Sequence, residues 1–418
     1  MARRLFLHVG TPKTGTSYLQ SVVWANAQTL ADAGLLLPLG SVREHFYLST
    51  IARDATRAKD VMPRAGQTAW ARMVEQLAAW DGDALISHEL FAAVPPDRIT
   101  WVRQELMKVS DALHVIVTAR DFARQVPAEW QQSIKHGRTH DLRAYCKRLQ
   151  ATDPDGAKQQ PAKSSAFFWR VQHLPRVLDK WGPDLPSDQT HLVTVPPREA
   201  PKGLLWQRFA SVLDIDPGAV DQSVTLPNES LGVDEIEMLR RVNTLVPRDL
   251  PGPQVQLMIK QVLAEGVLAT RADMRRIRVP DDLHAWMVER GRAMAQQLRL
   301  GSWPVAGDLD ELLPGSQPPG GTRPDDVDDS AVAAVAVETV VRLLFERDDT
   351  VQLMAQQRTL TTELEKRAAR VDQLRKELKR EQAEREWERR HPVRAQTRRV
   401  TRRVRRQLSR GSRSADVA

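Results

Sequence analysis

The sequence predicts an α/β fold in which helices cover both faces of a doubly wound parallel sheet. Short, continuous apolar runs recur through the first 195 residues, and amphipathic stretches of helical period separate them. Strands of a parallel sheet are buried on both faces and therefore read as unbroken apolar runs, and their alternation with helices is typical of α/β proteins. With 418 residues, 41% of them hydrophobic, the chain can form one large domain with appendages.

The predicted elements follow from these patterns in chain order. The predicted strands are Leu5–Val9, Ala84–Ser87, Leu113–Ala119 and Thr190–Val195, with a further short strand within Gly34–Pro38. The predicted helices between them are Ser17–Ala33, Thr68–Trp80, Asp97–Ser110 and Phe122–His136. After Val195 the pattern becomes helical, and it predicts Leu204–Leu213, Val233–Leu245, Gln254–Ala264 and Asp281–Leu298.

Composition divides the chain into four predicted parts. Residues 1–305 form the α/β domain with its helical C-terminal part, and residues 306–330, rich in Pro, Gly and Asp, form a linker. Residues 331–390 are predicted to be helical. A heptad spacing of apolar residues, interrupted at Arg367 and Glu381, predicts a weak coiled coil that could join copies of the chain. The residues with this spacing are Leu360, Leu364, Val371, Leu374 and Leu378.

Residues 391–418 form an arginine-rich tail that carries the whole net charge of +8. The tail holds nine arginines and one acid, which leaves 52 basic and 52 acidic side chains in the rest of the chain. As a helix the tail would be amphipathic, which fits an anionic membrane surface, but arginine-rich ends are as often disordered. Nucleic acid is a weaker interpretation because no aromatic residues interleave the arginines.

Several function classes are disfavoured by the rest of the composition. The single cysteine, Cys146, excludes an internal disulfide framework and a cysteine metal cluster. The chain shows no signal-peptide pattern and no apolar stretch of about 18 residues, so we expect a cytoplasmic protein, with the tail as its one candidate contact to the inner membrane surface.

The stretch from Leu5 to Gln20 predicts an anion site. An apolar strand runs into a loop of Gly, Thr, Pro and Lys, and a helix follows. Backbone N–H groups and the positive end of the helix then point at one place, which favours phosphate or sulfate. Gly10 and Gly15 have the spacing of the G-x-x-x-x-G-K-[ST] loop, but Thr16 stands at the lysine position and the lysine lies at Lys13 instead.

The run "TPKTGTSYL" from Thr11 to Leu19 resembles the 5′-phosphosulfate loop, P-K-[ST]-G-T-[ST]-x-L, of sulfotransferases that use 3′-phosphoadenosine 5′-phosphosulfate (PAPS). The resemblance implies a P-loop-type sulfotransferase fold and covers about Arg4 to Leu213. It implies that Lys13 contacts the 5′-phosphate and the bridging oxygen, and that the rest of the motif binds the donor, namely Pro12, Thr14, Gly15, Thr16 and Ser17. No metal ion is expected.

A second motif follows the third long strand. Sulfotransferases of this type bind the 3′-phosphate with an arginine at this strand end, which matches Arg120, and with a serine eight residues later, where this chain has Ala128. Gln131, Gln132 or Lys135 would share the helix face of Ala128. The alternative is that Arg120 and Asp121 form a structural ion pair or helix cap. In the later loop Arg198 or Lys202 could add a contact to the 3′-phosphate.

A catalytic base is predicted at the end of the strand Ala84–Ser87, where His88 and Glu89 follow. Carboxyl ends of parallel strands collect ligand-binding residues, and an attacking hydroxyl must lose its proton. We favour Glu89 over His88; the structural alternative is that Glu89 caps the next element and His88 packs in the core. His8, on the first strand, is more simply a core histidine.

The sequence therefore predicts a sulfotransferase that transfers a sulfuryl group from PAPS to a hydroxyl or amine of a carbohydrate, glycolipid or small metabolite. One alternative is a P-loop kinase using ATP, against which Thr16 at the lysine position counts. The other is an inactive, sulfotransferase-like scaffold that acts through its membrane-surface tail, which the missing serine at Ala128 favours. The identity of the acceptor is not encoded in any motif.

Overall fold

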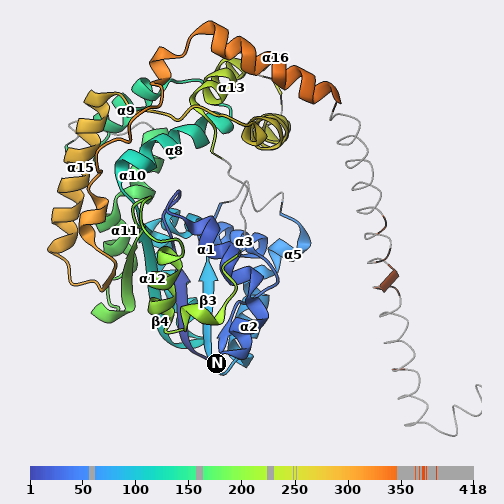
Figure 1. Cartoon of the computed structure of the whole chain (residues 1–418). Coiled ribbons are helices and arrows are strands. Elements are labelled where there is room, and N and C mark those ends of the chain that lie inside the picture. The colour runs from blue at the N-terminus through green and yellow to red at the C-terminus, as the bar shows by residue number, and fades with distance from the viewer. Residues whose placement is uncertain are drawn as a thin grey trace, which may run out of the picture. The chain divides into compact units, whose positions relative to one another are not determined.

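The computed structural model of this chain describes residues 1–55, 62–156, 163–223, 230–247, 249–250 and 252–345, with single positions between 363 and 383. Its contacts divide the chain into two units, Met1–Thr339 and Val340–Ala418. The first unit contains the sheet and its surrounding helices (Figure 1). Most of the predicted coiled coil and all of the arginine-rich tail lie outside the described residues and stay predictions.

Within the described ranges the sheet has six strands, all parallel, in the order β2-β3-β1-β4-β5-β6. The strands are β1 (Ala2–His8), β2 (Leu35–Leu36), β3 (Asp83–Ser87), β4 (Ser110–Ala119), β5 (Thr190–Thr194) and β6 (Val305–Ala306). β1 is central, since Leu7 pairs with Ile86 of β3 and with Val115 of β4. The chain turns from one side of β1 to the other between β3 and β4, and sheets of this kind bind ligands at such a switch point.

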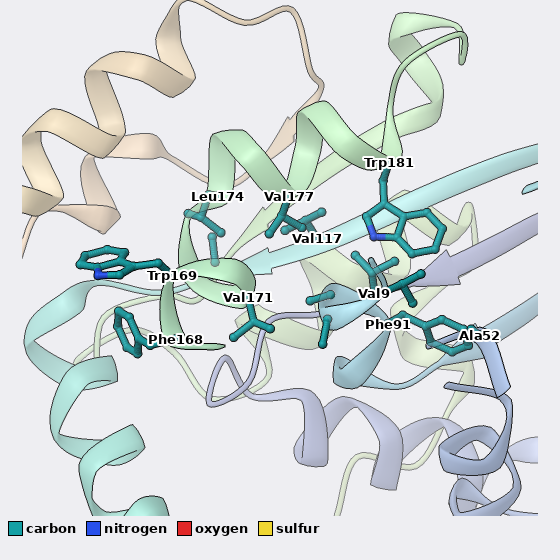
Figure 2. Close-up of a cluster of buried hydrophobic side chains, with 14 of the residues drawn as sticks. Val9, Ala52, Phe91, Val117, Phe168, Trp169, Val171, Leu174, Val177 and Trp181 are labelled. Atoms are coloured by element: carbon teal, nitrogen blue, oxygen red, sulfur yellow. The ribbon is translucent and has the colours of Figure 1, made fainter. Parts of the chain in front are cut away.

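Neighbouring residues of β1 point into two different cores. Phe6 lies in a cluster with Leu19 of α1 (Thr16–Ala25) and Trp206 of α12 (Leu204–Leu213). Leu5 and Leu7 lie in the larger cluster, which includes side chains of α8 (Phe122–Lys135) and α11 (Leu174–Trp181). Figure 2 shows part of this larger cluster around Val117 and Trp181. Burial on both faces explains the unbroken apolar runs, and the predicted doubly wound parallel α/β fold is confirmed.

Most predicted helices occur within a few residues of their expected bounds. The bounds of α12 and α13 (Val233–Leu245) match the prediction. Those of the other predicted helices are α6 (Ala69–Ala79), α7 (Pro96–Met107), α8 and α15 (Asp281–Arg299). Helices that were not predicted are α3 (Val42–Ala52), α5 (Arg64–Gln67), α9 (Leu142–Ala151), α10 (Lys163–Gln172) and α11. α16 (Asp329–Phe345) lies at the start of the stretch 331–390 that was expected to be helical. In the part of the chain that the structure describes, no helix is both long and apolar enough to cross a bilayer.

Two predicted helices differ from the structure. The expected Ser17–Ala33 helix is divided into α1 and α2 (Ala27–Asp32) at Asn26, whose side-chain amide donates to the Asp221 carbonyl at 2.8 Å and accepts from the Asp221 N–H at 2.9 Å. This contact joins residues 195 positions apart, so no local pattern could reveal it. The expected Gln254–Ala264 helix begins as α14 (Gly252–Val255) and continues as a π-helix, Gln256–Val267.

Residues 306–330, the stretch expected to be a linker, make specific contacts with the body of the first unit. Val193 of β5 pairs with Ala306 of β6. The Glu311 carboxylate receives two hydrogen bonds from Arg208 at 2.6 and 2.8 Å. Thr322 forms a parallel bridge with Ile277. This stretch therefore helps to build the surface beside the carboxyl ends of the strands.

Candidate functional site

The loop between β1 and α1 has three residues in the left-handed backbone region. The φ angles are 58° at Gly10, 66° at Lys13 and 77° at Gly15. Gly15 is required for two reasons: its φ angle is one that favours glycine, and a Cβ atom there would lie 2.6 Å from the Leu205 side chain. At Lys13 a side chain tolerates this conformation at a cost, and such backbone strain is concentrated at functional sites.

The loop is anchored from inside by two buried threonines. The Thr14 hydroxyl donates to the Thr11 carbonyl and lies 2.6 Å from the Thr118 hydroxyl, while the Thr11 hydroxyl donates to the Thr118 carbonyl at 3.1 Å. These bonds tie the loop to the end of β4. Because the Thr14 hydroxyl is used in these bonds, only the backbone N–H of Thr14 remains for the contact with PAPS that the sequence predicts.

The backbone of the loop is well suited to an anion. Among the described residues, no hydrogen bond uses the backbone N–H groups of Thr14, Gly15, Thr16 or Ser17. They lie at the start of α1, where the first N–H groups of a helix have no partner within it and the helix dipole is positive. Ser17 is exposed and lines a cavity of 1250 Å³.

The Lys13 side chain reaches the same cavity. Its ammonium group donates to the Gln132 side chain of α8 at 2.8 Å. The preceding carbonyl, that of Pro12, accepts from Gln125 at 2.8 Å and from Gln172 at 3.0 Å. Two glutamines from different helices therefore hold the loop in the conformation that directs Lys13 toward the cavity.

Arg120 adjoins the loop at the end of β4 and also lines the cavity. One terminal nitrogen donates to the Lys13 carbonyl at 3.1 Å, while the buried Nε–H has no partner among the described residues. Burial, together with the positive charges of Arg124 and Arg198, lowers the pKa of Arg120 to about 10. An unpaired buried donor is costly, and a bound anion would satisfy it.

The alternative, in which Arg120 and Asp121 form a structural ion pair or helix cap, fits Asp121 but not Arg120. Asp121 caps α8 by accepting from the Arg124 N–H at 2.9 Å, and its carboxylate pairs with the Arg124 guanidinium. Arg124 also donates to the Val195 and Pro196 carbonyls. Asp121 is thus a helix cap paired with Arg124, and Arg120 remains directed at the loop and the cavity.

One face of α8 borders the cavity where the serine of the motif is replaced. The residues of this face that line the cavity are Ala128, Gln131, Gln132 and Lys135. Ser133 points away, since its hydroxyl donates to the Trp130 carbonyl at 2.7 Å. From the later loop Arg198, but not Lys202, lines the cavity.

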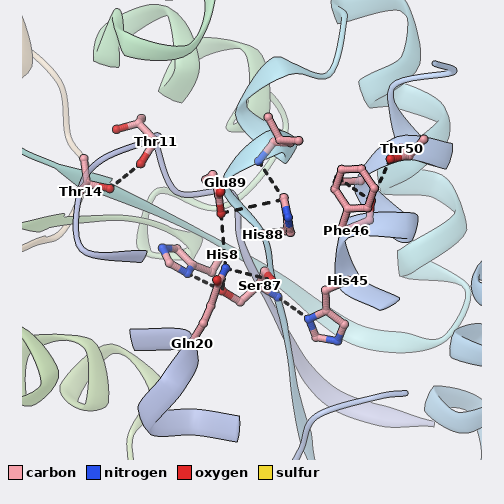
Figure 3. A network of polar contacts seen from close by, with 12 residues as sticks. His8, Thr11, Thr14, Gln20, His45, Phe46, Thr50, Ser87, His88 and Glu89 are labelled. Atoms are coloured by element: carbon pink, nitrogen blue, oxygen red, sulfur yellow. Dashed lines mark hydrogen bonds and ion pairs between the residues drawn. The ribbon is translucent and has the colours of Figure 1, made fainter. Parts of the chain in front are cut away.

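The two candidate bases lie beside the loop and have different environments (Figure 3). His88 is almost fully buried and caps the short helix Glu89–Ala93, since its Nδ1 accepts from the Leu90 N–H at 3.1 Å. Burial lowers the pKa of His88. Its Nδ1 is used in this bond, so the proton of the neutral ring is on Nε2 and neither nitrogen is free to accept another. The cap is therefore His88, and not Glu89 as the structural alternative had it.

Glu89 is open to the solvent and to the loop. Its side chain is 30% exposed, and one carboxylate oxygen lies 3.5 Å from the Gln20 amide of α1. A Cβ atom at Gly10 would come within 3.1 Å of the Glu89 backbone, which places Glu89 directly against the loop. A carboxylate in this position can accept a proton from a group that approaches the loop.

Sequence reasoning missed a third ionisable group, Glu129 of α8. Its carboxylate accepts from Gln172 at 3.2 Å, and burial raises its pKa to about 7, with the Glu89 charge adding to the rise and Lys13 opposing it. Glu129 therefore lies within electrostatic range of both Lys13 and Glu89. The available signal was that it is the single acid of its helix, "FARQVPAEWQQSIK". The role of Gln125 and Gln172 carried no such signal, because it depends on tertiary placement.

Two histidines are buried beneath the site. His8 contacts the Ser87 hydroxyl at 2.8 Å, as expected for a core histidine. His45 accepts from the Ser87 N–H at its Nδ1 and contacts the Pro38 carbonyl through its Nε2, so its neutral ring satisfies both groups. Figure 3 shows this arrangement around Ser87. Burial lowers the pKa of His8 to about 3 and that of His45 to about 4.

These histidines predict a loss of stability in acid. Below about pH 6.5 these histidines become protonated in the unfolded chain but stay neutral in the folded one. The stability that the fold has above pH 6.5 is therefore lost as the pH falls. Each histidine should reduce the free energy of unfolding by about 1.4 kcal/mol per pH unit between pH 6 and pH 4.5. Urea unfolding at pH 7, 6, 5 and 4.5 measures this slope. His45→Asn should be less pH-dependent than the wild type, and an equal slope in both would contradict the assignment.

Comparisons with known proteins add one distant likeness. No family model and no curated protein matches the chain. Among solved structures, a sulfotransferase from Alicyclobacillus acidocaldarius is similar over 62% of this chain and 97% of that chain, with 12% sequence identity and a TM-score of 0.35. A likeness this distant carries no argument about residues or activity, so the case for function depends on the site itself.

Proposed function

We propose that the protein is a PAPS-dependent sulfotransferase that acts on a hydroxyl or amine of a carbohydrate, glycolipid or small metabolite. The observation that carries this proposal is the position of Lys13. This lysine is held in a left-handed conformation beside the unpaired N–H groups of the loop, and its ammonium group faces a cavity that Arg120 also lines. The loop would hold the phosphosulfate of PAPS, and Arg120 its 3′-phosphate.

The reaction is an in-line transfer. The acceptor oxygen attacks sulfur, the bond between sulfur and the bridging oxygen breaks, and its electron pair leaves with 3′-phosphoadenosine 5′-phosphate (PAP). Lys13 stabilises the charge that develops on the leaving oxygen, and the loop N–H groups stabilise the 5′-phosphate. The acceptor proton passes to a base beside the loop. We assign this role to Glu89, because the nitrogens of His88 are occupied as described above.

The kinase alternative has less support from the site. A P-loop kinase requires a lysine after the second glycine to reach the terminal phosphate, and this chain has Thr16, which is buried. The inactive-scaffold alternative depended on the absent serine at Ala128. Gln131 and Gln132 line the cavity on the same helix face, so polar groups remain available there.

A binding measurement tests the proposal. Calorimetry should show micromolar or tighter binding of PAP, and no comparable binding of ATP with magnesium. Arg120→Ala should weaken PAP binding at least tenfold, because a charge-assisted bidentate contact is lost. Arg292→Ala, at an exposed arginine of α15 away from the cavity, is the matched control and should bind like the wild type. Tighter binding of ATP with magnesium than of PAP would favour the kinase.

A further inference from the structure

The cavity beside the loop is larger than the donor alone needs. Pockets for one small ligand are commonly about 300–1,000 Å³, and this cavity measures 1250 Å³. The donor contacts proposed above use the part of the lining that holds Lys13, Ser17 and Arg120. Much of the remaining lining comes from a segment that sequence reasoning did not connect with the site, residues 271–279, and from the neighbouring stretch 315–320.

Backbone hydrogen bonds fix the segment 271–279 in place. The Arg276 carbonyl accepts from the Thr322 N–H at 2.9 Å, and the Arg278 N–H donates to the Thr322 carbonyl at 2.9 Å. The Gln317 side chain forms a pair of bonds with the backbone of Val279, both at 2.9 Å. The side chains of this segment are therefore presented by an ordered backbone rather than by a free loop.

The four arginines of this segment are not equivalent. Arg271 pairs with Glu235 and Glu338, and Arg275 pairs with Asp234, so acidic partners already neutralise both. The Arg276 side chain has no hydrogen bond or ion pair with any residue that the structure describes. Arg278 has one exposed contact, with Asp281 at 3.3 Å. Positive charge that the fold does not use is thus concentrated at Arg276 and Arg278.

The rest of the lining does not cancel this charge. Nine Lys and Arg and five Asp and Glu line the cavity, although the chain outside its tail is balanced. Among those acids, Glu311 and Asp310 are engaged by Arg208 and Arg299, and Asp121 by Arg124. The lining acids without an arginine partner among the described residues are Glu199 and Asp273. The lining is therefore net cationic, and Arg276 and Arg278 lie outside the part of it that the proposed donor contacts use.

We infer that the acceptor carries an anionic group in addition to its nucleophile, and that Arg276 and Arg278 bind this group. The inference rests on the proposed function and specifies the substrate class. The group would be a carboxylate, a sulfate ester or a phosphate ester, since a guanidinium binds each of them through paired hydrogen bonds. An anchor of this kind would hold the acceptor while its hydroxyl or amine approaches the loop.

The test uses the full chain saturated with PAP, so that the donor site is filled. Glucuronate, glucose 6-sulfate and glucose 6-phosphate are titrated by calorimetry, with glucose as the neutral probe. At least one anionic sugar should bind about tenfold more tightly than glucose. Comparison of the three titrations then identifies whether a carboxylate, a sulfate ester or a phosphate ester is preferred. The double variant Arg276→Gln/Arg278→Gln should lose this preference while its affinity for PAP stays within twofold. Arg292→Gln is the control and should keep the preference.

Three results would overturn the inference, and they can be told apart. If no anionic sugar binds better than glucose to the wild type, the cavity does not select anions at a second position. If the double variant loses PAP binding tenfold, the two arginines belong to the donor site. If the wild type does not bind PAP at all, the proposed function fails and this inference fails with it.

Discussion

Replacing Lys13 with alanine is expected to reduce PAP formation from PAPS at least about a hundredfold. Removing one group that stabilises charge developing in the transition state commonly costs a factor of about 10²–10³ in kcat. In the structure the Lys13 ammonium group makes one hydrogen bond, to Gln132, so the fold loses little when the side chain is removed. The measurement is the rate of PAP release, with water or an added alcohol as acceptor.

A second substitution separates catalysis from folding at this position. Lys13→Gly should also lose activity, but it should not lower the free energy of unfolding, because glycine adopts a φ of 66° without the strain that lysine bears. Lys147→Ala, at an exposed lysine of α9, is the control and should leave the rate unchanged. A Lys13→Ala variant that retained more than half of the wild-type rate would remove the basis of the proposed mechanism.

The parts of this molecule that local patterns encode could be predicted from sequence. β1, β3, β4 and β5 are apolar runs because both of their faces are buried, and the loop motif is contiguous from Pro12 to Ser17. β6 could not be predicted, since it has two residues and depends on pairing with β5. The division of the first long helix at Asn26 likewise depends on a partner far along the chain.

The same distinction applies to the candidate site. Arg120 directly follows β4, and Lys13 lies in the loop that follows β1, so topology brings both to one edge of the sheet. Glu129, Gln172 and Arg276 reach the site on elements whose positions depend on packing between helices and on the bridge to Thr322. Their sequence neighbourhoods resemble ordinary surface helices and loops. Tertiary contacts, and not a motif, therefore define the wall of the cavity that would select the acceptor.

Replacing Glu89 with glutamine is expected to lower kcat about 10²–10³-fold while PAP affinity stays within twofold, because general base catalysis contributes about 10²–10⁴. Glutamine keeps the size of the side chain and its contact with Gln20, but it cannot accept a proton. PAP release at saturating PAPS measures the rate, and calorimetry with PAP measures the affinity. A parallel loss of PAP affinity would show that Glu89 supports the loop instead of the chemistry.

His88→Asn is the variant that decides between the two candidate bases. Asparagine can still cap the helix Glu89–Ala93, so this change should cost little stability and leave kcat within about threefold if Glu89 is the base. The opposite pattern, with His88→Asn losing the rate and Glu89→Gln keeping it, would assign the base to His88. It would also require the hydrogen bond from the Leu90 N–H to His88 to break during turnover, since that hydrogen bond occupies the Nδ1 lone pair of the neutral ring. The Glu89 carboxylate needs no such rearrangement, because it already lies partly exposed against the loop.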